Sequence, residues 1–359
     1  SIPFASKSQK VLLKLLEKIS LLKIKMDKNS KWRSFDELLS KLNAEKLNIY
    51  DFEEPFRKDE IAAIFPTSGS TGESKGVEIT NENKISGSYY MNYVSVMKAN
   101  VPAIVLSLFV PNWDIYNEED ITGLDYKTLF KIEQIDLKNS IYLASLNAYR
   151  KAGKTINVTL EKPYVTLVSE ESKTNLLVLD EIISIDGKKF TKLSEFQEYI
   201  SSLDFDDKVT FVVKENGKEK EKYAYVINLE GEKKVGISIV TEYDFESDPK
   251  LEMKTKASEA GSSGGLMLSL EIYDKLTSKD LSHGKKVMGT GTIDEDGNIG
   301  AIGGVKYKML GAQKDGADIF FVPKENYDEA KKVYKKNNLS FELVMVETFD
   351  EAINYLNNL

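Results

Sequence analysis

A glycine- and serine-rich segment, Gly261-Ser262-Ser263-Gly264-Gly265, constrains this chain most, because it leads straight into an apolar helical pattern. Small residues let a backbone turn sharply, and such a turn leaves amide N–H groups free for other partners. Apolar residues then recur at three- and four-residue spacing from 266 to 276 without a proline, which predicts a helix. Ser263 would lie near its N-terminus, where the macrodipole favours developing negative charge. A loop that merely caps a buried helix is the alternative, since serine is a favoured N-cap.

A second glycine pair, Gly303-Gly304, precedes another helical pattern over residues 305–314, which carries Lys308. Between the two helices, residues 287–293 read as a strand, and Asp294 to Asn298 reads as a hairpin turn. Thr290 in this strand is placed to hydrogen-bond a lysine. A lysine on a helix is most often solvated, so neither stretch decides the chemistry alone.

The residue types that could act as a general base limit the possible catalytic mechanisms further. A serine nucleophile needs a neighbouring base, and this chain has one histidine, His283, in a polar stretch. Cysteine is absent, which excludes thiol catalysis, disulfides and thiolate metal sites. Lysine remains, because burial can lower the pKa of an ammonium group by several units. The two stretches therefore predict a Ser-Lys hydrolase.

The series G-x-S-x-G-L-M, T-G-T-I, D-G-N-I-G-x-I-G-G and x-K-x-K-M resembles the proteolytic domain of Lon, and in particular the PDZ-containing, Lon-like surface proteases of bacteria. The resemblance covers about residues 80–359. It implies that Ser263 is the nucleophile, Lys308 rather than Lys306 the general base, and Thr290 the residue that orients this base. A Walker-type phosphate loop is missing from the sequence, so we expect activity without ATP.

Two departures from the family pattern surround the nucleophile. The family reads G-P-S-A-G, whereas Ser262 replaces the proline here and Gly264 replaces the alanine. Ser262 is therefore a second candidate nucleophile. Lon domains also carry an acidic residue where this chain has Ala260. We expect the backbone around Ser262, Gly264 and Gly265 to form the oxyanion hole.

Residues 163–229 alternate strand-like runs with one helix. The segment Asp180 to Lys188 resembles a PDZ domain, a module that adds extended peptides to a sheet edge. Such domains usually have glycine where Leu179 stands. A β-rich spacer is the alternative. The peptide groove is expected to be lined by Tyr164, Val165, Thr166 and Leu167.

Residues 65–77 resemble the phosphate loop of adenylate-forming enzymes, in which glycines and hydroxyls wrap phosphate oxygens. The sequence changes family directly after this loop, so a truncated remnant or fusion joint is expected, and a Ser-Gly linker is the alternative. The candidate nucleotide loop comprises Thr67, Ser68, Gly69, Ser70, Thr71, Gly72 and Lys75.

The 359 residues predict a multidomain α+β protein in which a PDZ-like β domain precedes an α/β Lon-type proteolytic domain. The expected divisions are an N-terminal segment over 1–83, a mixed helix and strand lead-in over 84–160, a PDZ-like domain over 161–232 and the proteolytic domain over 233–359. In the lead-in, residues 126–152 read as a long helix that is expected to pack rather than to catalyse.

The net charge of −8 argues against nucleic-acid binding, and a polypeptide substrate is expected. No cofactor and no metal site are expected. A basic helical stretch over 7–31 could lie on an anionic membrane or pack on its own domain. No run of the sequence reaches the length of a membrane span. The resemblance implies a location at the bacterial cell surface or membrane, and the lack of an anchor keeps the cytoplasm as an alternative location. Because Lon domains commonly form rings, a homo-oligomer is an alternative to a monomer.

The leading functional hypothesis is an ATP-independent serine endopeptidase whose PDZ-like domain presents the substrate. A non-catalytic peptide-binding module is the second, because Ser262 and Gly264 alter the family's active-site loop. A nucleotide-binding adenylate-forming fragment is the third.

Overall fold

The computed structural model describes residues 61–66, 77–79, 87–92, 94–98, 107, 114–117, 124–190, 193–215, 217–253 and 259–359. The candidate nucleotide loop and the basic stretch over 7–31 lie outside these residues. The chain divides into two compact units, one formed by Ser1–Ala63 and Met97–Asp120, the other by Ile64–Val96 and Ile121–Leu359. The described part before the first long helix contains β1 Ile61–Pro66, β2 Val77–Ile79, β3 Ser88–Met91, β4 Val94–Lys98 and β5 Asp114–Asn117.

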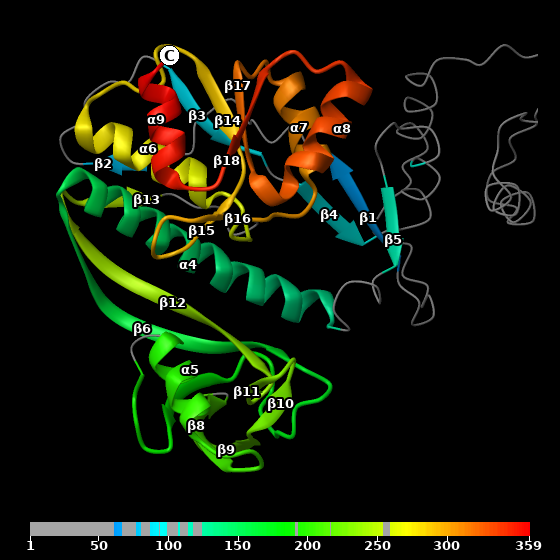
Figure 1. The fold of residues 1–359 in the computed structure, drawn as a ribbon, viewed down its shortest axis with the longest axis vertical. Coiled ribbons are helices and arrows are strands. Elements are labelled where there is room, and N and C mark those ends of the chain that lie inside the picture. Colours follow the sequence, from blue (N-terminus) through cyan, green and yellow to red (C-terminus); the bar gives the residue numbers. More distant parts are fainter. Residues whose placement is uncertain are drawn as a thin grey trace, which may run out of the picture. The chain divides into compact units, whose positions relative to one another are not determined.

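A four-stranded parallel sheet forms the centre of the C-terminal part, in the order β18-β17-β14-β3 (Figure 1). Its strands β14, β17 and β18 span Lys286–Gly289, Ile319–Pro323 and Glu342–Val346. All five residues of β17 are buried, as expected for a parallel strand covered on both faces. The elements around the sheet are helices α6 Gly265–Thr277, α7 Val305–Lys314, α8 Tyr327–Asn337 and α9 Phe349–Asn357, a 3-10 turn Lys324–Asn326, and the short strands β15 Thr292–Ile293 and β16 Ile299–Gly300.

The two faces of this sheet carry different helices. Val287 belongs to a core with residues of α6 and α9, whereas Met288 belongs to a second core with residues of α7 and α8. Successive strand residues point to opposite faces, so this division fixes the side on which each strand residue lies. The face that carries α7 is therefore the face that receives Lys308.

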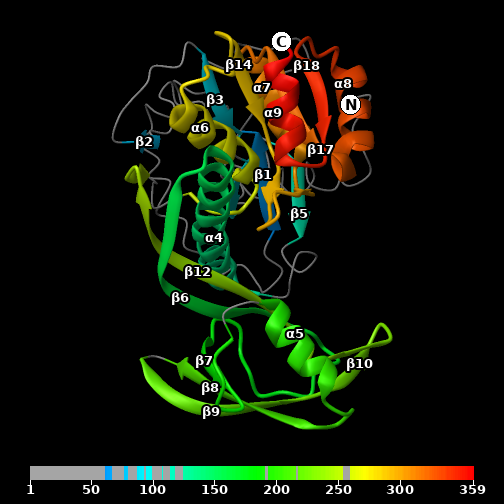
Figure 2. The same cartoon turned by 60° about the vertical axis from the view of Figure 1, so that its left-hand side comes forward.

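Helix α4, Tyr126–Ala152, has the bounds that the sequence predicts. The Asp125 side chain accepts hydrogen bonds from the backbone N–H groups of the first turn, and Gly153 ends the helix at φ 67°. Ala144, Ala148 and Tyr149 pack into the core that α6 shares. Helices α4 and α6 lie side by side (Figure 2). α4 therefore lies directly behind the segment that carries the serine.

The PDZ region is a five-stranded sheet in the order β12-β6-β7-β8-β9, with helix α5 against its core. Leu179 precedes β7 at φ 71°, a conformation that glycine adopts without strain. The strands are β6 Thr155–Val168, β7 Glu181–Ile185, β8 Lys208–Glu215, β9 Lys218–Tyr225 and β12 Ile237–Asp248, and α5 spans Leu193–Ser202. The remaining strands are β10 Ile227–Leu229 and β11 Glu232–Lys234, which pair with each other, and β13 Leu251–Met253, which pairs with β2.

The expected groove segment Tyr164–Leu167 lies inside this sheet. Tyr164 is paired with Val240 of β12 on one side and with Glu181 of β7 on the other. Both backbone groups of Val165 bond the segment before β7, since its N–H donates to Asp180 O and its carbonyl accepts from Leu179 N. The start of this segment therefore has no free edge, and the prediction that 164–167 line a strand-addition groove is corrected. Sequence cannot show the reason, which is that the last long strand, β12, returns to pair beside β6.

Candidate active site

Ser263 and Lys308 meet at the C-terminal end of β14. Ser263 lies two residues before α6, whose N-cap is Gly264, and Lys308 is the fourth residue of α7. Lys308 Nζ lies 2.6 Å from Ser263 Oγ, although 45 residues separate the two in sequence. This distance is within the range that a nucleophile and its base require.

Thr290 fixes the position of the lysine. Its hydroxyl donates to the Ser263 carbonyl at 3.0 Å, so its oxygen lone pairs remain to accept from Lys308 Nζ at 3.0 Å. Thr290 follows β14, and its backbone N–H donates to Phe321 O of the adjacent strand at 3.1 Å. The sheet therefore holds the threonine, and the threonine links the serine backbone to the lysine side chain.

The loop 261–264 is held by α4 on one side and by the end of β14 on the other. Gly261 N donates to Glu133 O at 2.7 Å, and Ser140 Oγ donates to Ser262 O at 3.0 Å. Gly291 N donates to Ser263 O at 2.9 Å. Three anchors over three consecutive residues leave the nucleophile little freedom, which favours a preorganised site.

Burial is the main cause of the altered pKa values here. Lys308 is 4% exposed, and burial lowers its pKa from 10.5 to about 8, against the opposing charge of Glu133. Burial also raises the pKa of Glu133, while Lys308 acts to lower it. For Asp136, one turn further along α4, burial and the charge of Glu133 raise the pKa to about 6. A lysine with a pKa near 8 has a substantial neutral fraction at physiological pH, as a general base needs.

The three residues expected to form the oxyanion hole differ in whether their backbone groups are already hydrogen-bonded. Gly265 N donates to Ser262 O at 3.2 Å, so this amide is used within the turn. Among the described residues, the amides of Ser263 and Gly264 have no hydrogen-bond partner, and both precede the first turn of α6. They are the donors available to an oxyanion, whereas Ser262 contributes a carbonyl that is already bonded to α4.

The replacement of alanine by Gly264 has a local packing reason. A Cβ atom on Gly264 would lie 2.5 Å from Met91 Sδ, which is closer than real Cβ contacts. A Cβ on Gly265 would lie 2.8 Å from Ile293 Cγ2. The Met91 side chain from β3 therefore takes the room that an alanine methyl would need beside the nucleophile.

His283 is placed elsewhere. Its Nε2 atom lies 3.1 Å from Leu356 O at the end of α9. A carbonyl only accepts, so this nitrogen donates and is not available as a base. The structure thus leaves lysine as the base next to Ser263.

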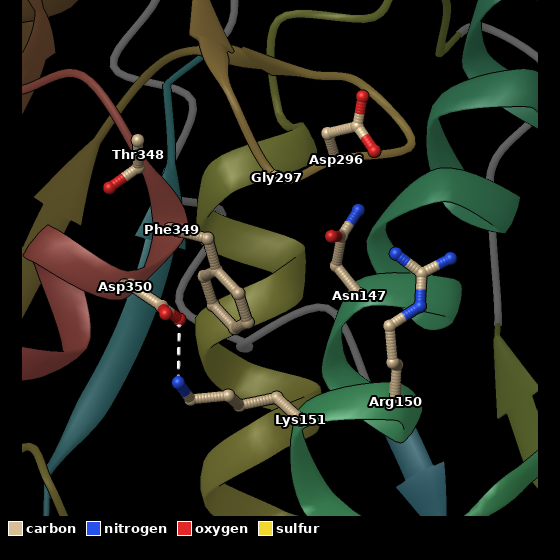
Figure 3. A pocket seen from close by; sticks show the side chains of 8 residues that line it. All are labelled: Asn147, Arg150, Lys151, Asp296, Gly297, Thr348, Phe349 and Asp350. Atoms are coloured by element: carbon tan, nitrogen blue, oxygen red, sulfur yellow. Dashed lines mark ion pairs between the residues drawn. The ribbon is translucent and has the colours of Figure 1, made fainter.

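A pocket of about 390 Å³ lies apart from these residues, between α4, the β15–β16 turn and the start of α9 (Figure 3). Asn147 Nδ2 donates to Asp294 O at 2.8 Å, and Arg150 donates to Glu295 O at 2.8 Å. Lys151 forms an ion pair with Asp350 at 2.8 Å. The polar side chains that line the pocket hold the 294–298 hairpin and α9 against α4, so these side chains have a structural role.

Sequence reasoning assigned α4 to packing and missed Glu133 and Ser140. Both contact the nucleophile loop from about 120 residues earlier in the chain. Their positions on an ordinary helix carry no local motif, so no signal in a single sequence could have identified them.

Comparisons with known proteins find two domains that match parts of this chain. Residues 254–357 match the family model of the Lon protease (S16) C-terminal proteolytic domain, and residues 153–223 match that of the PDZ domain. The Lon protease of Mesomycoplasma hyopneumoniae is 30% identical over 96 residues, which are 27% of this chain and 11% of that protein. The Lon protease of Clostridium acetobutylicum is 31% identical over 93 residues, 26% of this chain and 12% of that protein.

Among solved structures, the PDZ domain of the SdrC-like protein of Listeria innocua is 29% identical and covers 22% of this chain and 92% of that chain, with a TM-score of 0.21. The chain spans about a tenth of the length of the curated relatives it matches. No helix among the described residues is both long and apolar enough to cross a membrane. Residues 254–357 thus match a Lon-type proteolytic domain, and residues 153–223 of the same chain match a PDZ domain.

Proposed function

We propose that this protein is a serine endopeptidase in which Ser263 is the nucleophile and Lys308 the general base. The observation that carries the proposal is the 2.6 Å separation of Lys308 Nζ and Ser263 Oγ, with the lysine buried and its pKa lowered to about 8. A buried, partly neutral amine in contact with a serine hydroxyl is the arrangement that nucleophilic catalysis requires.

In the acylation step, neutral Lys308 takes the proton of Ser263 Oγ as this oxygen forms a bond to the peptide carbonyl carbon. The amides of Ser263 and Gly264 donate to the carbonyl oxygen as it becomes negative, aided by the N-terminus of α6. The Lys308 ammonium then gives its proton to the amine nitrogen, and the carbon–nitrogen bond breaks. In deacylation, neutral Lys308 takes a proton from water as the water oxygen forms a bond to the acyl carbon. The bond from this carbon to Ser263 Oγ then breaks, Ser263 Oγ takes the proton back from the Lys308 ammonium, and the carboxylic acid leaves.

The PDZ domain would present the substrate at the edge strand β12. Within the described sheet, β12 is paired on one side with β6, and Ile237 and Ile239 pack toward the core that contains α5. Asn139 of α4 donates to Thr241 O at 2.8 Å, so the accessible part of this edge is its start, residues 237–240. An extended peptide added there would be bound mainly through its backbone.

The test is cleavage of unfolded casein, without ATP, by the wild type and the Ser263→Ala, Ser262→Ala and Lys308→Met variants. We expect cleavage by the wild type and by Ser262→Ala, the matched control, and its loss in the other two. Cleavage that survives Ser263→Ala refutes the proposed nucleophile. A wild type that binds peptides at β12 without cleaving any of them supports a binding module, the function that the altered loop would favour.

A further inference from the structure

Asn92 follows β3 and is a buried polar residue that the proposed mechanism leaves unused. Its side chain belongs to a residue that is 5% exposed, and among the described residues its Oδ1 atom has no hydrogen-bond partner. Leaving a buried acceptor unpaired is unfavourable, because the group has lost its water. Such a group needs an explanation, and function is one of the few available.

Strand register places Asn92 beside Thr290. β3 and β14 are parallel, and their last paired residues are Met91 and Gly289. Asn92 and Thr290 are the next residues on the two strands, so they are lateral neighbours about 5 Å apart between backbones.

Side-chain alternation places both residues on the face that carries α7. Tyr90 packs against the core shared with α7, and Met91 packs against the core on the opposite face. Asn92 therefore returns to the side of Tyr90, the side on which Thr290 contacts Lys308. After β3 the chain runs on beside the start of α7. A Cβ atom built on Gly304, the N-cap of α7, would lie 3.2 Å from Val94 Cγ2.

Lys308 has an N–H donor for which the described residues supply no acceptor. Among the described residues, Lys308 Nζ makes two hydrogen bonds, to Ser263 Oγ and Thr290 Oγ1. A neutral amine accepts from the serine at its lone pair and donates one N–H to Thr290, so its second N–H has no acceptor among the described residues. An ammonium has three donors and no lone pair, so its third N–H needs an acceptor.

We propose that Asn92 is a positioning residue of the dyad: its side-chain oxygen accepts the third hydrogen bond of the Lys308 ammonium that forms when Ser263 transfers its proton. The proton leaves Ser263 Oγ and bonds to the Lys308 lone pair, so the new N–H points at Ser263 Oγ. A rotation of the Asn92 side chain brings its oxygen to the N–H that neither Ser263 nor Thr290 accepts. The proposal rests on the proposed function, since it assigns a role within the same proton transfer.

Other charges act on Lys308 and must be held constant in the test. Glu133 on α4 acts on the lysine and raises its pKa, and Asp136 lies beside Glu133. Ser263 and Thr290 face it with neutral hydroxyls. Substitutions at Asn92 alter none of these groups directly.

The experiment is an NMR titration of Lys308 in full-length protein with 13Cε-labelled lysine, assigned with Lys308→Met, for the wild type, Asn92→Leu and Asn92→Asp. Leucine has a similar shape and accepts no hydrogen bond, so we expect the pKa of Lys308 to fall by about one unit. Aspartate accepts and adds a negative charge, so we expect a rise of about one unit or more. Loss of packing cannot move the titration in opposite directions in two variants.

An unchanged Lys308 titration in both variants overturns the proposal, and so does a shift in the same direction in both. If Asn92→Leu fails to fold, the Asn92→Asp titration decides the matter alone. The titration needs no substrate, so it separates this inference from the proposed function. In parallel, the rising limb of casein cleavage against pH should move down in Asn92→Leu and up in Asn92→Asp; a wild type without cleavage would refute only the peptidase.

Discussion

Replacement of the buried lysine should make the protein more stable while removing its activity. Burial lowers the pKa of Lys308 from 10.5 to about 8, so the folded state binds the proton less tightly than the unfolded chain does. At 1.36 kcal/mol per pKa unit, a lysine charged at pH 7 costs the fold roughly 3 kcal/mol. Methionine matches the aliphatic stem and carries no charge. We therefore expect Lys308→Met to raise the free energy of unfolding at pH 7 by about 1–2 kcal/mol, after allowance of about 1 kcal/mol for each lost hydrogen bond to Ser263 and Thr290.

The sign of the pH dependence gives a second readout. Between about pH 8 and 10.5 the unfolded chain carries the extra proton, so the stability of the wild type rises with pH in this window. The advantage of Lys308→Met should disappear at pH 10. The assay is urea unfolding at both pH values, with the exposed Lys335→Met as the control that should show no such difference. A Lys308→Met protein that is no more stable than the wild type at pH 7 refutes the argument from burial.

Three further outcomes follow from the same contacts. Glu133→Gln removes the charge that holds the pKa of Lys308 up, so the rising limb of kcat/KM should move to lower pH; a limb that stays in place shows that this charge does not reach the base. Gly264→Ala should lower kcat/KM by a few-fold, roughly two to five, because the methyl makes the flexible end of the Met91 side chain move, and Met91→Ala in the same chain should restore part of it; equal losses in the single and double variants contradict this steric account. Leu179→Gly should raise the free energy of unfolding by about 1 kcal/mol in urea, because φ is 71° there, whereas Leu179→Ala should give no gain.

The sequence predicts the local elements of the site well because each has its own signal. The helix after Gly264 and the helix that carries Lys308 both appear where the sequence pattern places them. Glycine pairs mark both turns. The PDZ and Lon-type domains were also recognisable from short motifs, and both family models match.

What the sequence could not predict is long-range contact. Glu133 and Ser140 reach the nucleophile loop only because α4 packs beside α6. From the sequence alone, glycine in place of alanine at position 264 suggests a defect in the active-site loop. In the structure, the Met91 side chain lies where the alanine methyl group would be. The prediction of a groove at Tyr164 was wrong because β12 pairs with β6 and covers the strand edge at this residue. The order of strands in a sheet cannot be read from the sequence of one strand.

The central claim, that Lys308 activates Ser263, is tested most directly by covalent labelling with a serine-directed fluorophosphonate, followed by mass spectrometry of the intact protein and of its peptides. The account predicts one label on Ser263 in the wild type and in Ser262→Ala, none in Ser263→Ala, and labelling slowed by about 100-fold or more in Lys308→Met. A label on Ser262, or equal labelling rates with and without Lys308, would contradict it.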